Sequence, residues 1–158
     1  MFGLNMSLAG QSGRFSKNLF NPAVGSITAN GVTCTVATGG TITLNGTATA
    51  NTRFCLTGAT LQSSNDLGFA DQYLAPIKIV PYTLSSSQII PSNMFVYVRE
   101  VNVNLLTLNN TLTNTQTPIT LDHISYVFIR VVSGAAFTNF SFKLQLEQNT
   151  VATAWEQY

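Results

Sequence analysis

Side chains that could exchange protons with a substrate, or attack one, are few in this sequence. They lie far apart along the chain: Asp66, Asp71, Glu100, Asp122, His123, Glu147 and Glu156. General acid–base chemistry needs two or more such groups held together. Asp122 and His123 are adjacent, but neighbours on a strand point to opposite faces, and a surface turn after Pro118 is the favoured interpretation. We therefore predict that the protein is not an enzyme.

The two cysteines are expected to be free thiols. Cys34 shares a strand face with Val32 and Val36, whereas Cys55 has the opposite parity to Phe54 and Leu56. One thiol should then point into a core and the other away from it, which makes a disulfide the less favoured alternative because a bridge needs facing side chains.

No metal or other cofactor is predicted. Two cysteines and a single distant His123 do not make a zinc site, and the carboxylates of Asp66 and Asp71 are too few to assign calcium.

The charge balance excludes several classes of partner. Seven Lys and Arg against six Asp and Glu give a net charge of +1, which lacks the basic excess needed for nucleic-acid binding. No apolar run approaches the roughly 20 residues of a membrane-spanning helix. The first ten residues also lack the basic leader and apolar core of a secretion signal, so none is expected.

Most polar residues of this chain are uncharged, and their types favour strands and turns. Only 8% of residues are charged, and Thr, Asn and Ser supply the remaining polarity. Alternation of apolar and polar residues predicts strands, and Asn45-Gly46 is the expected hairpin turn. Residues 77–80, between two prolines, are either an edge strand or an extended connection. The other predicted strand segments are 32–37, 41–44, 53–60, 94–103, 105–112, 125–132 and 140–147.

These elements predict an all-β fold, an antiparallel β-sandwich formed by residues 25–158. In the last segment Phe140, Phe142, Leu144 and Leu146 should pack, while Ser141, Lys143, Gln145 and Glu147 should face water. Residues 1–24 are predicted to be an irregular N-terminal arm, since Gly and Pro interrupt their hydrophobic residues. This arm is either a flexible end or a segment ordered by a neighbouring subunit.

A candidate glycan-binding loop lies in the centre of the sequence. Sugars are bound by exposed aromatic faces surrounded by polar side chains. An irregular segment has that composition, and its candidate residues are Asp66, Phe69, Asp71, Gln72 and Tyr73. The alternative is that these aromatic residues plug one end of the sandwich.

Several local motifs occur in a characteristic order. They are Asn18-Leu-Phe-Asn21, Asn30-Gly-Val-Thr-Cys-Thr-Val36, residues 40–51, Val127-Phe-Ile-Arg-Val-Val-Ser-Gly134, and Leu144-Gln-Leu-Glu147 through Trp155-Glu-Gln-Tyr158. Together they resemble the carbohydrate-binding-module-like jelly-roll domains of bacteriophage tail, baseplate and fibre proteins. The resemblance covers most of residues 18–158 and implies a jelly-roll topology. It also implies that Trp155 and Tyr158 belong to a structural closing segment near the opening Asn18-Leu-Phe.

The resemblance implies a virion structural protein of the tail, baseplate or fibre assembly, made in the host cytoplasm, with host surface glycans as candidate ligands. Its partners would be other virion proteins and further copies of itself in a symmetric homo-oligomer such as a trimer. The arm would serve attachment. The alternative is a capsid decoration or head-fibre protein that cements major capsid subunits. A bacterial surface lectin is a third interpretation, which the missing secretion signal disfavours.

Overall fold

The computed structural model describes Asn18 and residues 20–64, 80–99, 105–108, 119–121, 126–148 and 153–154, and every structural statement below concerns these residues. They form twelve strands: Gly25–Ala29 (β1), Val32–Val36 (β2), Ile42–Thr47 (β3), Thr52–Cys55 (β4), Gln62–Ser64 (β5), Val80–Ser86 (β6), Met94–Arg99 (β7), Leu105–Leu108 (β8), Ile119–Leu121 (β9), Tyr126–Val131 (β10), Ala136–Phe142 (β11) and Leu144–Glu147 (β12).

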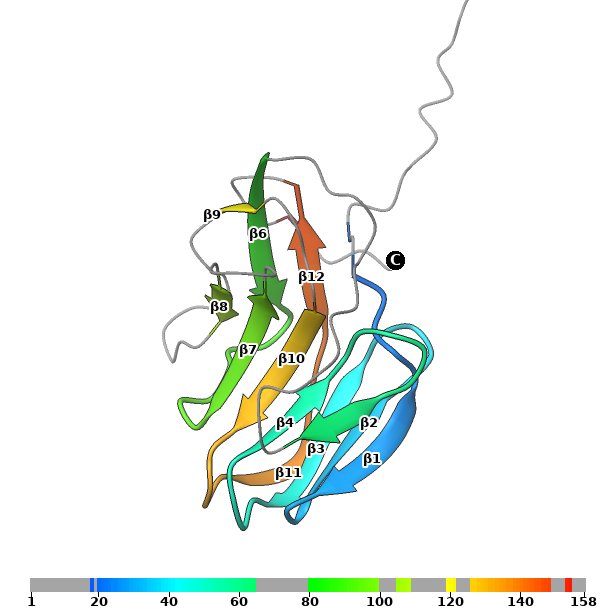
Figure 1. The fold of residues 1–158 in the computed structure, drawn as a ribbon, viewed down its shortest axis with the longest axis vertical. Helices are drawn as coiled ribbons and strands as arrows, with labels where there is room; N and C mark the ends of the chain where they lie inside the picture. The colour runs from blue at the N-terminus through cyan, green and yellow to red at the C-terminus, as the bar shows by residue number, and fades with distance from the viewer. Residues whose placement is uncertain are drawn as a thin grey trace, which may run out of the picture.

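These strands form three antiparallel sheets. Their strand orders are β1-β2-β3-β11, β5-β4-β10-β7-β8 and β12-β6-β9. Strand β12 begins two residues after β11 ends, so the last strand of the four-stranded sheet leads directly into a strand of the three-stranded sheet. In Figure 1 the five-stranded sheet lies in front of the four-stranded sheet. The predicted all-β, antiparallel β-sandwich is therefore confirmed; the jelly-roll topology stays a prediction.

Alternating residues of both sheets form one core between the layers. The inward positions are apolar because each strand presents every second residue to the same side. From the four-stranded sheet come Val32, Cys34, Val36, Ile42 and Leu44, and from the five-stranded sheet come Phe54, Val96, Val98, Val127, Ile129 and Val131. Each of these side chains is at most 1% exposed.

Within the described residues the predicted strand positions hold for most segments, although one strand is much shorter than expected. The described parts of segments 94–103 and 105–112 are β7 and β8, which pair with each other. Segment 53–60 shortens to β4, which ends at Cys55. Beyond it, Gly58 has φ +100°, a backbone angle that a strand does not use.

The hairpin predicted at Asn45-Gly46 is wrong. Strand β3 continues through both residues, and the tight turn lies instead at Asn30-Gly31, between β1 and β2, where φ is +46° and +79°. Gly46 is required for a different reason: a Cβ there would lie 2.2 Å from the carbonyl oxygen of Gly31. The same dipeptide thus makes a turn at one site and permits close backbone approach at the other.

The end of the expected arm packs against the sandwich. Phe20 is 2% exposed and belongs to the core, while Asn18 and Ala23 are also buried. The backbone N–H of Ala23 donates to the carbonyl of Leu56 at 2.7 Å. The packed unit therefore includes Asn18 and residues 20–24, which were predicted to belong to the arm.

The predicted wet face of the last segment is wrong for two residues. Gln145 and Glu147 are only 1% and 2% exposed, although their alternation with Leu144 and Leu146 indicated a solvent-facing side. The segment is also not one strand, because Lys143 separates β11 from β12 and the pairing partner changes from β3 to β6 there. Local periodicity does not register such a change of partner.

Candidate functional site

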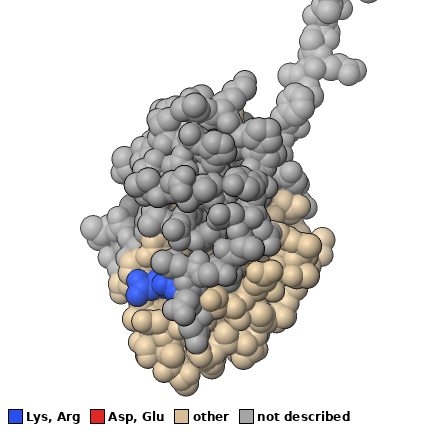
Figure 2. Space-filling model, in the orientation of Figure 1, with Lys and Arg blue, Asp and Glu red and all other residues tan. Residues whose placement is uncertain are grey.

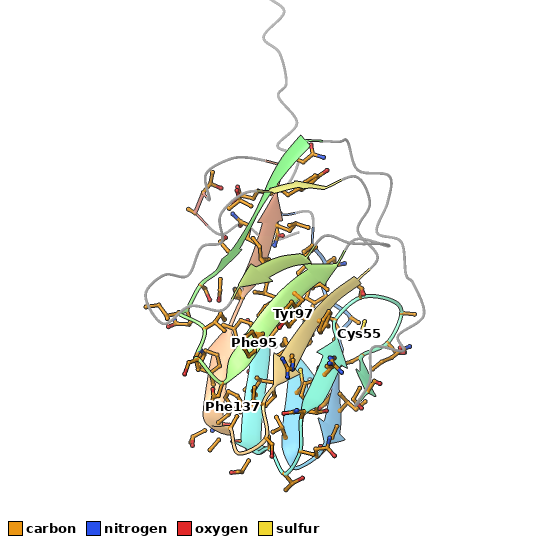
Figure 3. All side chains as sticks on the ribbon, turned by 60° about the vertical axis from the view of Figure 1, so that its left-hand side comes forward. Cys55, Phe95, Tyr97 and Phe137 are labelled. Carbon is orange, nitrogen blue, oxygen red and sulfur yellow. The ribbon has the colours of Figure 1, made fainter. Side chains whose placement is uncertain are left out.

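The outer face of the five-stranded sheet carries aromatic and arginine side chains. On β7, Val96 and Val98 point into the core, so Phe95 and Tyr97 lie on the opposite face. Strands β4 and β10 add further outward residues, because Phe128 lies opposite Tyr97 and Arg130 lies opposite Phe95. We call this surface the aromatic–arginine face; it consists of Arg53, Phe95, Tyr97, Phe128 and Arg130. In Figure 3, Phe95 and Tyr97 lie along β7.

The three rings of this face form a continuous stack. The ring centroids of Phe95 and Tyr97 are 5.8 Å apart with an interplanar angle of 5°, and those of Tyr97 and Phe128 are 4.7 Å apart at 22°. Phe128 is 2% exposed, while Phe95 and Tyr97 remain partly exposed. The buried ring thus supports two accessible rings, whose faces and edges could pack against the C–H groups of a ligand.

Two guanidinium groups flank the ring stack. The Cζ of Arg130 lies 5.5 Å from the centroid of Phe95, a cation–π contact. Arg53 sits directly opposite Arg130 in the pairing of β4 with β10. The Nε of Arg130 is shielded from solvent and has no hydrogen-bond partner among the described residues. The row across β4, β10 and β7 therefore places two arginines next to the ring of Phe95.

The described part of the chain contains few acidic residues. Within the described ranges the only acidic residue is Glu147, which is 2% exposed. Figure 2 shows a small basic area on this side of the molecule and no acidic atoms on the described part of the view. Among the described residues of the aromatic–arginine face, the charged side chains are those of Arg53 and Arg130.

The outer face of the four-stranded sheet is different. It carries a hydroxyl face, which we define as Ser26, Thr28, Thr33, Thr35, Thr43 and Ser141. Their oxygens pair across strands at 2.8 Å in each case: Ser26 with Thr35, Thr28 with Thr33, and Thr43 with Ser141. No residue of this set is charged, and each hydroxyl already has a partner within the sheet.

The two cysteines are free, as expected, but both are buried. Burial raises the pKa of the Cys34 thiol to about 12, so this thiol keeps its proton and is a poor nucleophile. Cys55 lies on the opposite side of its sheet from the main core, which agrees with its predicted parity. It is nevertheless 1% exposed, because it packs with Phe128 and Tyr97, and its sulfur lies 3.3 Å from the hydroxyl of Thr57.

The opening segment is clamped to β12 through the side chain of Asn18. Its Oδ1 accepts from the backbone N–H of Leu146 at 3.1 Å, and its Nδ2 donates to the carbonyl of Leu144 at 3.0 Å. The same Oδ1 accepts from the N–H of Phe20 at 3.0 Å. One buried amide thus joins two segments about 126 positions apart and satisfies backbone groups that would otherwise be buried alone.

The buried polar residues of β12 hold the segment that follows it. The Glu147 carboxylate accepts from the N–H of Thr153 at 2.9 Å and from its hydroxyl at 2.5 Å. Nε2 of Gln145 donates to the carbonyl of Ala154 at 3.3 Å. These contacts explain why two residues predicted to face water are buried: the returning chain covers them.

The candidate residues named from the sequence, Asp66, Phe69, Asp71, Gln72 and Tyr73, lie outside the described residues, as do Trp155 and Tyr158. The aromatic–arginine face was not predicted, although its signal was present in the sequence. In Met94-Phe-Val-Tyr-Val, two aromatic residues alternate with three aliphatic residues, so they lie on the other face of the strand. Tyr126-Val-Phe-Ile-Arg alternates in a similar way. Apolar side chains on both faces of a strand indicate that its second face is also packed or forms an apolar surface.

Neither a metal centre nor a membrane span emerges from the described part of the chain. No three His, Cys, Asp or Glu side chains lie close enough there to hold a metal ion, and it contains no helix of the length and apolarity needed to cross a bilayer. Comparison of the chain with protein-family models, with curated proteins and with solved structures finds no match.

Proposed function

We propose that this protein is a structural component of a bacteriophage virion, in the tail, baseplate or fibre assembly, and that it binds host surface glycans. The proposal rests first on the ordered motifs, which resemble those of phage jelly-roll domains. It is supported by the contacts those motifs make, since Asn18 of the opening motif bonds to Leu144 and Leu146 of the closing motif. Its partners are other virion proteins and copies of itself in a homo-oligomer.

The observation that carries the glycan part of this proposal is the aromatic–arginine face. Sugar rings pack their C–H surfaces on aromatic rings, and Phe95 and Tyr97 offer a partly exposed stack. Guanidinium N–H groups can donate to sugar oxygens, and Arg130 lies within the same row. The function is binding, and no catalytic step is proposed.

The second candidate is a capsid decoration or head-fibre protein, and the hydroxyl face favours it. A sheet surface without charge, whose hydroxyls are paired internally, can be covered by a neighbouring subunit at little desolvation cost. The two candidates differ in location on the particle, in the tail or on the head.

A reconstruction of the virion by cryo-electron microscopy tests the proposal. Density for this chain at the tail tip, baseplate or fibres is the expected result, whereas density on the capsid lattice would establish decoration instead. Purified protein should also block adsorption of the phage to host cells. Release of reducing sugar from host glycans, lost on replacing a carboxylate, would contradict the purely binding role.

A further inference from the structure

Strand β1 is an open edge of the four-stranded sheet. It pairs with β2 over five residues in unbroken register, and no described strand pairs with its other side. In Figure 1, β1 lies at the margin of the sandwich. An open edge presents a row of backbone N–H and C=O groups with which another strand can pair.

The hairpin turn decides which backbone groups of β1 face this open edge. In a two-residue turn such as Asn30-Gly31, the flanking Ala29 and Val32 form a hydrogen-bonded pair, and such pairs alternate along the ladder. Ser26 and Thr28 therefore do not use their N–H and C=O groups toward β2. These groups point to the open edge, and no described residue bonds to them. The side chains of both residues are exposed.

The other edge of the same sheet is protected, whereas β1 is not. Edge strands avoid pairing with another chain by means of bulges, prolines or charged side chains. Strand β11 has a shift of register between Phe137 and Phe140, and Asn139 within that shift has φ +48°. Strand β1 contains no proline, no charged residue and no register shift. The sequence of β1 therefore favours pairing with a further strand.

Strand β1 is also complementary to a second copy of itself. An antiparallel pairing about a twofold axis at Ile27 places Ser26 of each copy opposite Thr28 of the other. The outward N–H and C=O groups of these two residues then meet as hydrogen-bonded pairs. The hydroxyl face continues across the axis on the outer side. On the inner side Ile27, which is half-buried at the edge of the core, packs against its own copy.

We propose that β1 forms an antiparallel, twofold-symmetric contact with β1 of a second copy, which joins two four-stranded sheets into one continuous sheet. This inference rests on the homo-oligomer of the proposed function and specifies its contact. A strand from another protein would use the same backbone groups, but it would not require the match of Ser26 with Thr28 that the twofold axis creates. The contact is isologous, so it builds a dimer and not a closed trimer.

Sedimentation velocity of the full chain, from about 1 to about 300 μM, measures the assembly. We expect a dimer that dissociates on dilution, with a Kd of roughly 1–100 μM, since an edge contact is smaller than the interfaces of stable complexes. Ser26→Pro removes an outward N–H and keeps the pairing with β2, so it should raise the Kd about tenfold or more.

A matched pair of charged variants separates the edge from the face. Thr28→Lys places like charges near the twofold axis and should also raise the Kd about tenfold or more. Thr35→Lys adds the same charge to the hydroxyl face one strand away from the edge, and it should leave the Kd within about threefold. Thermal melting of each variant verifies that it is folded.

Cysteine variants test the register of the contact. Opposite residues of a hydrogen-bonded pair have Cα atoms about 5.5 Å apart, within disulfide range, whereas diagonal neighbours lie about 7–8 Å apart. Under mild oxidation, a mixture of Ser26→Cys and Thr28→Cys proteins should therefore form a covalent dimer in several-fold higher yield than either variant alone. Electrophoresis without reducing agent measures the yield. The native Cys34 and Cys55 are buried, and the wild type is the control for them.

Three results would overturn the inference: a monomer at every concentration, a dimer unaffected by both Ser26→Pro and Thr28→Lys, or equal crosslinking of mixed and single variants. A dimer that Thr35→Lys weakens as much as Thr28→Lys also contradicts it, because the interface would then be the hydroxyl face. A monomeric protein that is located at the phage tail removes the self-pairing and leaves the virion role standing. Absence of the chain from the particle contradicts the proposed function, whatever its assembly in solution.

Discussion

The two outer faces of this sandwich differ in how their polar groups are satisfied. On the hydroxyl face each described side-chain oxygen is paired with another from the same sheet, as for Thr43 and Ser141. On the aromatic–arginine face the rings stack, while Arg130 contacts a ring without meeting an acceptor. A face whose hydroxyl groups are paired with each other is suited to a structural role. A face with unpaired donors and accessible aromatic rings is suited to binding a ligand.

The largest predicted effect comes from removing the ring beneath the aromatic–arginine face. Phe128 is 2% exposed and stacks on Tyr97, so Phe128→Ala should lower the free energy of unfolding by about 3–5 kcal/mol. Urea denaturation measures this loss. Thr35→Ala on the hydroxyl face is the matched control and should cost less than about 1 kcal/mol. Equal losses in the two variants would mean that the faces do not differ in the way described.

The next largest effect on stability is expected from Cys34, which is buried on the inner side of the sheet that carries the hydroxyl face. The pKa of the Cys34 thiol is raised from 9.0 to about 12 by burial, so the folded protein keeps a proton that the unfolded chain releases. Stability from this thiol is complete below pH 9 and is lost as the pH rises from 9 toward 12. Between about pH 8 and pH 10.5 the loss should be roughly 2 kcal/mol.

The measurement is the urea midpoint of the wild type and of Cys34→Ala at both pH values. Cys34→Ala should show a smaller alkaline decline than the wild type. An identical pH dependence in the two proteins would exclude Cys34 as its origin.

A third prediction concerns a site that belongs to neither face. Asn18→Ala removes the clamp to Leu144 and Leu146 and leaves buried backbone groups without partners. The cost should be about 1–3 kcal/mol, measured as a lowered melting temperature with glycan binding by the folded protein unchanged. Asn45→Ala is a suitable control, because that side chain accepts a hydrogen bond at an exposed position. A cost no greater than that of the control would show that the clamp is not a stabilising contact.

The smallest effect is expected where polar groups pair with each other. Replacing Thr43 by Val together with Ser141 by Ala removes both oxygens of one exposed hydroxyl pair, so no lone partner remains. The free energy of unfolding should change by no more than about 0.5 kcal/mol in urea denaturation. A larger loss would mean that the hydroxyl pairs hold the sheet together and are not merely compatible with it.

The sequence allowed the class of fold to be predicted because alternation records which side of a strand is buried. Val32, Cys34 and Val36 are an example, and all three lie in the core. Alternation does not record what covers the second side of a strand. The prediction that Glu147 faces water was therefore wrong, because Thr153 covers it. The hairpin predicted at Asn45-Gly46 was wrong because Gly46 is required there by a neighbouring backbone.

The candidate site was predicted less well than the fold, for a related reason. Polar and aromatic residues that lie close together in the sequence, such as Phe69 and Tyr73, are easily recognised as a candidate site. Phe95 and Arg130 are 35 residues apart and become neighbours only through the antiparallel register of β7 and β10. A site built across strands needs that register, which a single sequence does not provide.

The clamp at Asn18 and the hold on Thr153 also have a mechanical consequence. Both attach to consecutive residues of one strand, the first at the N–H of Leu146 and the second at the carboxylate of Glu147. Tension that pulls Asn18 and Thr153 apart would act on these hydrogen bonds, both of which end on β12.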